Sequence, residues 1–261
     1  MLLEKDVDIN KQDNYGTTAL IDVAARGYDD IVKTLLDLGA DIELAKERNS
    51  ITAIYMASQN GHANVVKMLI DAGADIEKRN EHRMTPLFAA CRQGHDQVVE
   101  LLISSGADVN AENFFHTPLY TACENGHEKI VKLLLDAKVD ANAVTSCGTT
   151  ALIGACYKDS ENIVKMLLDS NVNVEHDYNG ENAFYTACLG GHKSVVKLLL
   201  PLISDVNKAD NQGMTPIYIS SQNGHESVVK LLLEHQVDVN KADIGCGPGH
   251  VVVKWWNTSR C

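Results

Sequence analysis

Cysteine and histidine are the residue types in this chain best suited to chemistry, because thiolates and imidazoles bind metals and serve as nucleophiles or bases. Both recur about every 33 residues. The recurring cysteines are Cys91, Cys123, Cys156 and Cys188, and the recurring histidines are His62, His95, His127, His192 and His225. Zinc needs ligands gathered around one centre, whereas residues spaced in this way form a ladder. We therefore expect structural packing for the cysteines, structural hydrogen bonds for the histidines, and no metal site.

A glycine-rich stretch at residues 243–249 is the other candidate for chemistry. It looks like the first motif of S-adenosylmethionine-dependent methyltransferases, in which glycines let the backbone approach the cofactor. That motif should follow an apolar strand, but Asn240, Lys241 and Ala242 precede it here, and only 11 residues follow His250. A GxxxxGKS/T phosphate loop, a GxSxG nucleophile turn and an HExxH zinc helix do not occur. The sequence therefore predicts neither an enzyme nor a bound cofactor.

The elements that position these residues come from an internal repeat. One phrase recurs seven times, and we use its first residue as the anchor: Thr18, Thr52, Thr85, Thr117, Thr150, Asn182 and Thr215. From each anchor to the residue that closes the repeat the distance is 25 residues in every copy, whereas the distance from that closing residue to the next anchor varies from 7 to 9 residues. Packed helices cannot gain a residue without rotating their apolar face, but surface loops can. The constant part is therefore predicted to be helical.

Two helices are expected in each repeat. Threonine is a good N-cap and proline suits the first helical position, so the anchor phrase should begin a short helix. Nine residues later the chain usually has glycine, which ends a helix in the left-handed conformation. An apolar block follows, such as residues 65–69, and it should form the second helix with one broad buried face.

These phrases resemble the ankyrin repeat, whose pattern is roughly DxxGxTPLHxAAxxGHxxVVxLLLxxGADVN, and the resemblance covers about residues 11–240. It implies an all-α solenoid of stacked helix-turn-helix units with projecting β-turn or hairpin connectors. We divide the chain into a partial N-terminal repeat at 1–10, full repeats at 11–43, 44–77, 78–110, 111–142, 143–175, 176–207 and 208–240, and a degenerate partial repeat or tail at 241–261.

Neither end matches a complete repeat, and neither supplies the polar cap that a solenoid needs. We therefore expect a fragment of a longer array or a truncated product. An alternative is that the array is the regulatory or targeting arm of a larger multidomain protein, with the glycine-rich tail as a remnant.

The net charge of -12 argues against nucleic acid and anionic membranes as partners, because both carry negative charge. No apolar stretch approaches the roughly 20 residues needed to cross a bilayer. Seven cysteines, an odd number without a disulfide pattern, fit a reducing compartment. We expect a monomer in the cytoplasm, with the nucleus also open, and with end-to-end association through uncapped repeats as an alternative.

Partner specificity should depend on positions that differ between repeats. The ankyrin resemblance implies a protein or peptide partner bound on the concave face, at the connector tips and the exposed ends of the first helices. The candidate contact residues there are Tyr15, Arg26, Arg48, Arg92, Phe114, Phe115, Tyr157, Tyr178 and Gln222. The aromatic ones among repeats 4 to 6 are the expected hot spots, since exposed aromatics are favoured anchors in interfaces. The alternative for Phe114 or Phe115 is that the ring folds back onto the next repeat.

Overall fold

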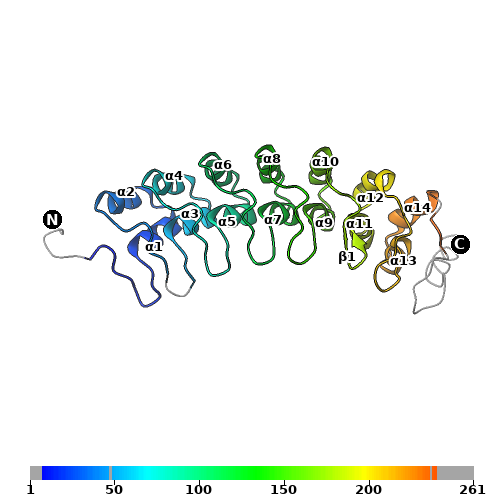
Figure 1. The fold of residues 1–261 in the computed structure, drawn as a ribbon, viewed down its shortest axis with the longest axis horizontal. Coiled ribbons are helices and arrows are strands. Elements are labelled where there is room, and N and C mark those ends of the chain that lie inside the picture. The colour runs from blue at the N-terminus through cyan, green and yellow to red at the C-terminus, as the bar shows by residue number, and fades with distance from the viewer. Residues whose placement is uncertain (1–7, 47–48, 236, 240–261) are drawn as a thin grey trace. The chain divides into compact units, whose positions relative to one another are not determined.

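The computed structural model describes residues 8–46, 49–235 and 237–239. The candidate Arg48 and the glycine-rich stretch at 243–249 therefore lie outside the described residues. The chain forms two compact units, with the boundary in the sequence between Asp140 and Ala141. Helices dominate both units (Figure 1).

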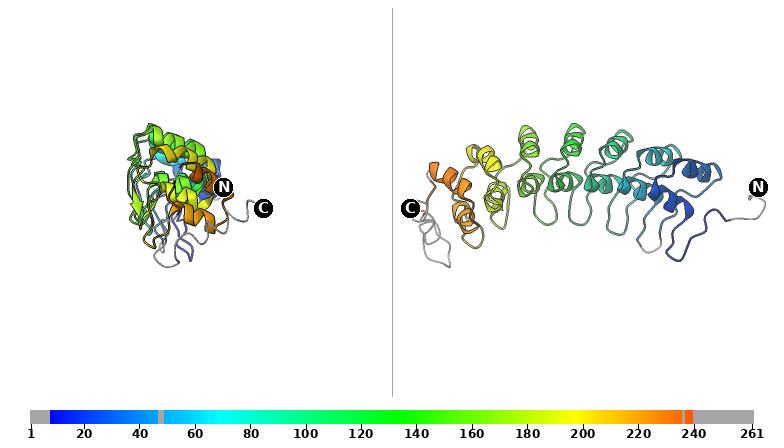
Figure 2. Two further views of the ribbon diagram at one scale, coloured as in Figure 1. Left: turned by 90° about the vertical axis from the view of Figure 1, so that its right-hand side faces the viewer. Right: turned by 180° about the vertical axis from the view of Figure 1, so that it is seen from behind.

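The first unit contains two layers of helices. Helices α1 (Ala19–Arg26), α3 (Ala53–Asn60), α5 (Pro86–Gln93) and α7 (Pro118–Asn125) pack side by side in sequence order. The second layer consists of α2 (Asp29–Asp37), α4 (Ala63–Asp71), α6 (Asp96–Ser104) and α8 (Glu128–Asp136). The connectors extend from the first layer on the side away from the second layer (Figures 1 and 2). Helix pairs from successive repeats therefore stack, as predicted.

The second unit repeats this arrangement with α9 (Ala151–Tyr157), α11 (Ala183–Gly190) and α13 (Pro216–Gln222) in one layer. Helices α10 (Glu161–Asp169), α12 (Lys193–Leu199) and α14 (Glu226–Glu234) form the other. A 3-10 turn, η1 (Leu200–Leu202), follows α12 and contains Pro201, which has no backbone N–H for a continuing α-helix.

One connector of the second unit is a β-hairpin. Strand β1 (Asp177–Tyr178) pairs antiparallel with β2 (Glu181–Asn182), with Tyr178 opposite Glu181. The two residues between them, Asn179 and Gly180, have φ of 57° and 84°, which is the arrangement of a two-residue type I′ turn. The predicted hairpin connector is confirmed at this position.

The predicted caps of the first helices are confirmed. Each anchor side chain accepts a hydrogen bond from the backbone N–H three residues later, as Thr85 does from Phe88 at 3.2 Å. The same bond occurs at Thr18, Thr52, Thr117, Thr150, Asn182 and Thr215. Glycine with φ between 71° and 86° ends α1, α3, α5, α7 and α11. Repeat 5 has Asp159 instead, and this residue adopts the same left-handed region at φ 59°.

The core lies between the two helix layers of each unit. Apolar residues of the second helices, such as Val65, Val66 and Leu69, are completely buried. The recurring cysteines are also completely buried, so the prediction that they pack at helix contacts is confirmed: Cys91, Cys123, Cys156 and Cys188. Burial raises the pKa of the Cys91, Cys156 and Cys188 thiols well above the usual value, which keeps them protonated and unreactive.

Two series of hydrogen bonds join successive repeats. In the first, the residue that closes a repeat accepts a bond from a backbone N–H of the next repeat; the Asn110 side chain accepts from Asp140 at 2.9 Å, and the Asn207 side chain from Asp238 at 2.9 Å. Asn10, Glu43, Glu77, Asn142 and Glu175 make the equivalent bond. Both residues of each pair belong to the constant part of a repeat, so the bond bridges the connector whose length varies.

The second series confirms the structural hydrogen bonds predicted for the histidines. The Nε2 atoms of His62, His95, His127 and His225 lie 2.9–3.2 Å from a backbone carbonyl at the end of the preceding first helix. His192 differs, because its Nδ1 lies 3.5 Å from the carboxylate of Asp159. In the described ranges, no helix is long and apolar enough to cross a membrane.

Candidate partner-binding surface

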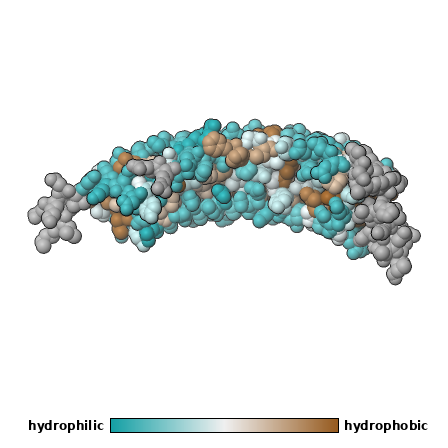
Figure 3. All heavy atoms as spheres, turned by 90° about the horizontal axis from the view of Figure 1, so that it is seen from below, coloured by the Kyte–Doolittle hydropathy of each residue, from teal (hydrophilic) through white to brown (hydrophobic). Residues whose placement is uncertain are grey.

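The described candidate contact residues lie at the connectors or at the ends of the first helices. Tyr15 is exposed in a connector, and so are Phe114 and Phe115. Arg26, Arg92, Tyr157 and Gln222 are exposed at or near the last residue of α1, α5, α9 and α13, and Tyr178 is exposed in β1. Seen from below, the surface is mostly hydrophilic with separate hydrophobic patches (Figure 3). The binding role of these residues remains a prediction.

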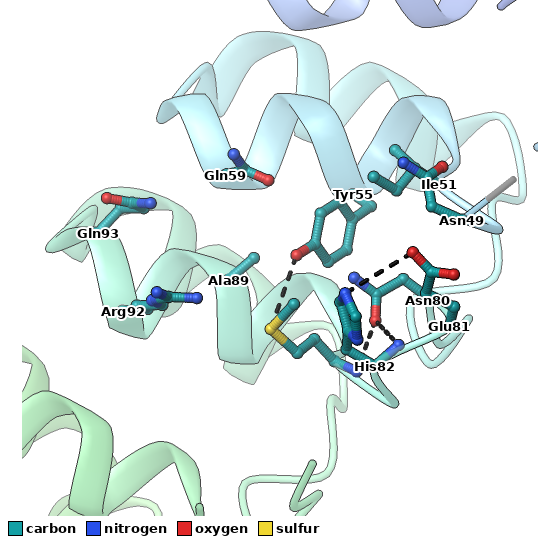
Figure 4. A pocket seen from close by; sticks show the side chains of 11 residues that line it. Asn49, Ile51, Tyr55, Gln59, Asn80, Glu81, His82, Ala89, Arg92 and Gln93 are labelled. Atoms are coloured by element: carbon teal, nitrogen blue, oxygen red, sulfur yellow. Dashed lines mark hydrogen bonds and ion pairs between the residues drawn. The ribbon is translucent and has the colours of Figure 1, made fainter. Parts of the chain in front are cut away.

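The first unit contains a hollow of about 190 Å³ between the first helices and connectors of repeats 2 and 3 (Figure 4). We call it the first hollow, and its walls include Asn49, Tyr55, Gln59, Glu81, His82, Met84, Arg92 and Gln93. Figure 4 shows Arg92 and Gln93 on one helix, facing Gln59 and Tyr55 on the neighbouring helix. The hollow therefore joins amide, phenol and guanidinium groups on adjacent repeats.

The wall of the first hollow is held by local hydrogen bonds. The Asn80 side chain accepts from the backbone N–H groups of His82 and Met84, both at 2.9 Å, and this shapes the connector. The Tyr55 hydroxyl donates to the Met84 sulfur at 3.9 Å. Desolvation raises the pKa of Tyr55, and the nearby charge of Arg92 offsets only part of this effect. Tyr55 is thus a neutral hydrogen-bond donor at physiological pH.

A second hollow of about 330 Å³ adjoins Arg92 on repeats 3 and 4. It is lined by Phe88, Arg92, Asn113, Phe115, His116, Thr121, Glu124 and Asn125. The Asn113 side chain accepts from the backbone N–H groups of Phe115 and His116, both at 2.7 Å. The His116 ring stacks on Tyr120 with 4.6 Å between ring centroids. Arg92 is common to both hollows, so the structure brings together two predicted residues, Arg92 and Phe115.

The two predicted phenylalanines have different surroundings. Phe115 is 59% exposed at the rim of the second hollow. Phe114 is 49% exposed, and the guanidinium carbon of Arg83, from the preceding connector, lies 5.8 Å from its ring centroid. This ring contact is with the preceding repeat, whereas the sequence alternative named the following one.

Tyr157 and Tyr178 belong to the second unit. Tyr157 is 70% exposed at the end of α9. The ring of Tyr178 covers Gly148 in the preceding connector so closely that a Cβ there would lie 2.2 Å from the tyrosine Cδ2. Tyr178 therefore has a packing role, and 48% of it remains exposed.

Sequence reasoning missed two lining residues: Tyr55, which belongs to the recurring phrase, and Met84, which lies in the connector just before the anchor Thr85. A signal was present, however. The third residue after the anchor is histidine in the ankyrin pattern, and this chain has Tyr55 there. In the described ranges, no group of three or more histidine, cysteine, aspartate or glutamate side chains gathers as a metal site.

Comparisons with known proteins agree with this architecture. A family model described as ankyrin repeats (3 copies) matches residues 43–113, 110–177 and 170–243, and one described as ankyrin repeats (many copies) matches residues 2–54. A comparison with curated proteins found no match. Among solved structures, the crystal structure of the human ASB11 ankyrin repeat domain is similar, with 26% sequence identity and a TM-score of 0.78 over 85% of this chain and 99% of that chain. The chain belongs to the ankyrin repeat family.

Proposed function

We propose that this chain is a non-enzymatic scaffold that binds a protein or peptide partner through its connector tips and first helices. Ankyrin repeats are generally protein-protein interaction modules. The variable positions of this chain lie on that surface, whereas its repeated positions make the core and the bonds between repeats. Specificity for a partner would therefore reside at the variable positions.

The observation that carries the proposal is the pair of adjoining hollows that share Arg92. Together they combine an exposed guanidinium, an exposed aromatic ring at Phe115, and amide groups at Gln59, Gln93 and Asn125. Arginine and aromatic residues in pockets are the groups that contribute most to binding at protein interfaces. An extended segment lying across repeats 2 to 4 would contact both hollows.

A random linear peptide library selected on the full chain tests the proposal. Phe115→Ala should weaken binding of the selected peptides by about tenfold or more, because an exposed aromatic anchor that the peptide would cover is lost. The matched control is Tyr28→Ala, which removes a similarly exposed ring outside both hollows. Helical circular dichroism should be unchanged in both variants. Equal affinities for the two variants would count against this site.

We propose six further contact residues: Tyr15, Arg26, Arg48, Tyr157, Tyr178 and Gln222. Tyr157→Ala is the cleanest test in the second unit, because this side chain is highly exposed. Its loss should lower the affinity of partners that contact the second unit. If Tyr157→Ala binds as tightly as wild type to every partner that covers Tyr157, this residue does not contribute to binding.

We further infer a cytoplasmic or nuclear location and a monomeric chain. An odd number of cysteines without disulfide spacing supports a reducing compartment. Sedimentation velocity over a range of concentrations tests the oligomeric state. A sedimentation coefficient that rises with concentration would instead support association of the chains.

A further inference from the structure

Arg92 is placed between the two hollows by the packing of α5. It lies on the last turn of this helix, and its side chain is exposed. Its backbone carbonyl lies 3.2 Å from Nε2 of His127, so the backbone of Arg92 is hydrogen-bonded to the next repeat. Figure 4 shows the Arg92 side chain beside the first hollow, across from Gln59. A cation with a fixed base is therefore presented to both hollows.

Among the residues that the structure describes, no carboxylate pairs with the charge of Arg92. Arg26, at the end of α1, pairs with Asp22 four residues earlier at 3.1 Å. The residue four positions before Arg92 is Phe88, which is buried, so α5 offers no carboxylate there. Across the described ranges no carboxylate lies within ion-pair distance of Arg92. In a chain with 35 acidic and 23 basic residues, this leaves a cation available for a partner.

The acidic residues that line the hollows face other groups. Glu81, in the first hollow, lies 3.6 Å from His82. Glu124, in the second, accepts a hydrogen bond from the Tyr120 hydroxyl at 3.4 Å. The groups that remain to meet a ligand beside Arg92 include the amides of Gln59 and Gln93 and the exposed ring of Phe115. This set suits an anionic group next to an apolar one.

We infer that the partner is a peptide segment that places an aspartate or glutamate side chain against Arg92 and an apolar side chain against Phe115. This inference rests on the proposed function and specifies its ligand. A guanidinium binds a carboxylate through two parallel hydrogen bonds, which also fixes the orientation of the segment. The net charge of -12 does not prevent this, because exposed charges are screened beyond about 8 Å at physiological ionic strength.

The test is the same peptide selection, carried out in parallel on the wild-type chain, Arg92→Glu and Glu124→Gln. Wild type should enrich an acidic position next to an apolar one, and Arg92→Glu should enrich a basic residue at that position. Glu124→Gln is the matched control within the second hollow and should keep the acidic preference. A synthetic peptide of the wild-type consensus should bind Arg92→Glu about tenfold or more weakly. If Arg92→Glu does not fold, Arg92→Gln in the same titration takes its place.

The outcomes separate the inference from the proposed function. Wild-type peptides without an acidic position, or identical peptides from wild type and Arg92→Glu, overturn the inference. If such peptides are still weakened by Phe115→Ala, the proposed site stands and only its ligand chemistry is wrong. If they bind both variants as tightly as wild type, the proposed site fails as well.

Discussion

In the second unit, the histidine that packs against the preceding repeat is placed differently at two joints between repeats. At the regular joint, between repeats 6 and 7, the His225 ring lies over Gly191 and its Nε2 is 2.9 Å from the Leu189 carbonyl. At the irregular joint, between repeats 5 and 6, Asp159 replaces this glycine and His192 lies beside its carboxylate. A Cβ at Gly191 would be only 2.4 Å from Nδ1 of His225. The Cβ of Asp159 therefore excludes the regular histidine position.

A second departure from the pattern compensates for the first. The residue before the helix-ending glycine is Arg26, Asn60, Gln93 or Asn125 in other repeats, but Gly190 in repeat 6. A Cβ at Gly190 would lie 2.2 Å from Nε2 of His192, so the displaced ring occupies the space of a side chain. Asp159 and Gly190 are 31 residues apart and are linked by one imidazole. The residue that fits at one repeat position therefore depends partly on the next repeat.

The largest expected effect is that of Gly191→Ala at the regular joint. The alanine would combine an unfavourable left-handed backbone with a clash against His225, and should lower the free energy of unfolding by about 2–4 kcal/mol. Urea denaturation measures this. Gly39→Ala is the control, because Gly39 has a similar φ of 80° and no atom lies within 4 Å of the place that a Cβ would occupy there. Equal losses for the two variants would show that the histidine contact contributes nothing.

Gly190→Ala tests the compensation at the irregular joint. In the wild-type background it should lower the free energy of unfolding by about 1–3 kcal/mol through the clash with His192. In an Asp159→Gly background the His192 ring can return to the regular position, so the loss should be smaller. A double-mutant cycle should give a coupling of about 1 kcal/mol or more. Additive effects would break the proposed link between the two positions.

The variants His225→Ala and His192→Ala test whether the histidine contributes more to stability at the regular joint than at the irregular one. His225→Ala removes a donor from the Leu189 carbonyl and should cost about 1–2 kcal/mol. His192→Ala removes a contact with a carboxylate that is half exposed, and such pairs contribute only about 0–1 kcal/mol. Thermal unfolding of both variants decides the order. A larger loss for His192 would mean that the irregular joint is the stronger one.

The smallest effect concerns pH and the connectors of the regular joint. Asp177 pairs with Lys208, and this hydrogen bond, with one from the Gly180 N–H, lowers the pKa of Asp177 below its usual 3.8. The ionised form is thus favoured in the folded state, and its stabilisation is present above pH 3.8 and lost as pH falls through the lowered pKa. Because both side chains are about one third exposed, the contribution is at most about 1 kcal/mol.

Asp177→Asn should therefore flatten the acid limb of stability against pH, measured by urea midpoints between neutral and strongly acidic solution. At the irregular joint the corresponding connectors are joined by His176, whose Nε2 lies 2.8 Å from the Gly148 carbonyl and involves no carboxylate. As the pH falls, the backbone amides in the connectors of repeats 6 and 7 should be the first to show faster hydrogen exchange. Simultaneous loosening of both joints would contradict this assignment.

Part of the candidate site could be predicted from residue types alone. Arg92 and Phe115 were expected at exposed ends and connectors, because variable polar and aromatic residues there are not needed for the core. Their common hollow could not be predicted, since it depends on the directions of side chains from α5 and the following connector. Tyr55 and Met84 were missed for the same reason: they are 29 residues apart, and only the stacking of repeats brings the hydroxyl to the sulfur.

Residue types and their spacing are sufficient to define the local architecture of this protein. Threonine caps, helix-ending glycines and apolar blocks act within one repeat, so residue type and spacing were sufficient to predict the helix pairs. Tertiary structure alone decided how residues about 32 positions apart meet. It displaced His192 onto Gly190 and left Arg92 without a carboxylate partner among the described residues, because both outcomes depend on the space and charge that a neighbouring repeat supplies.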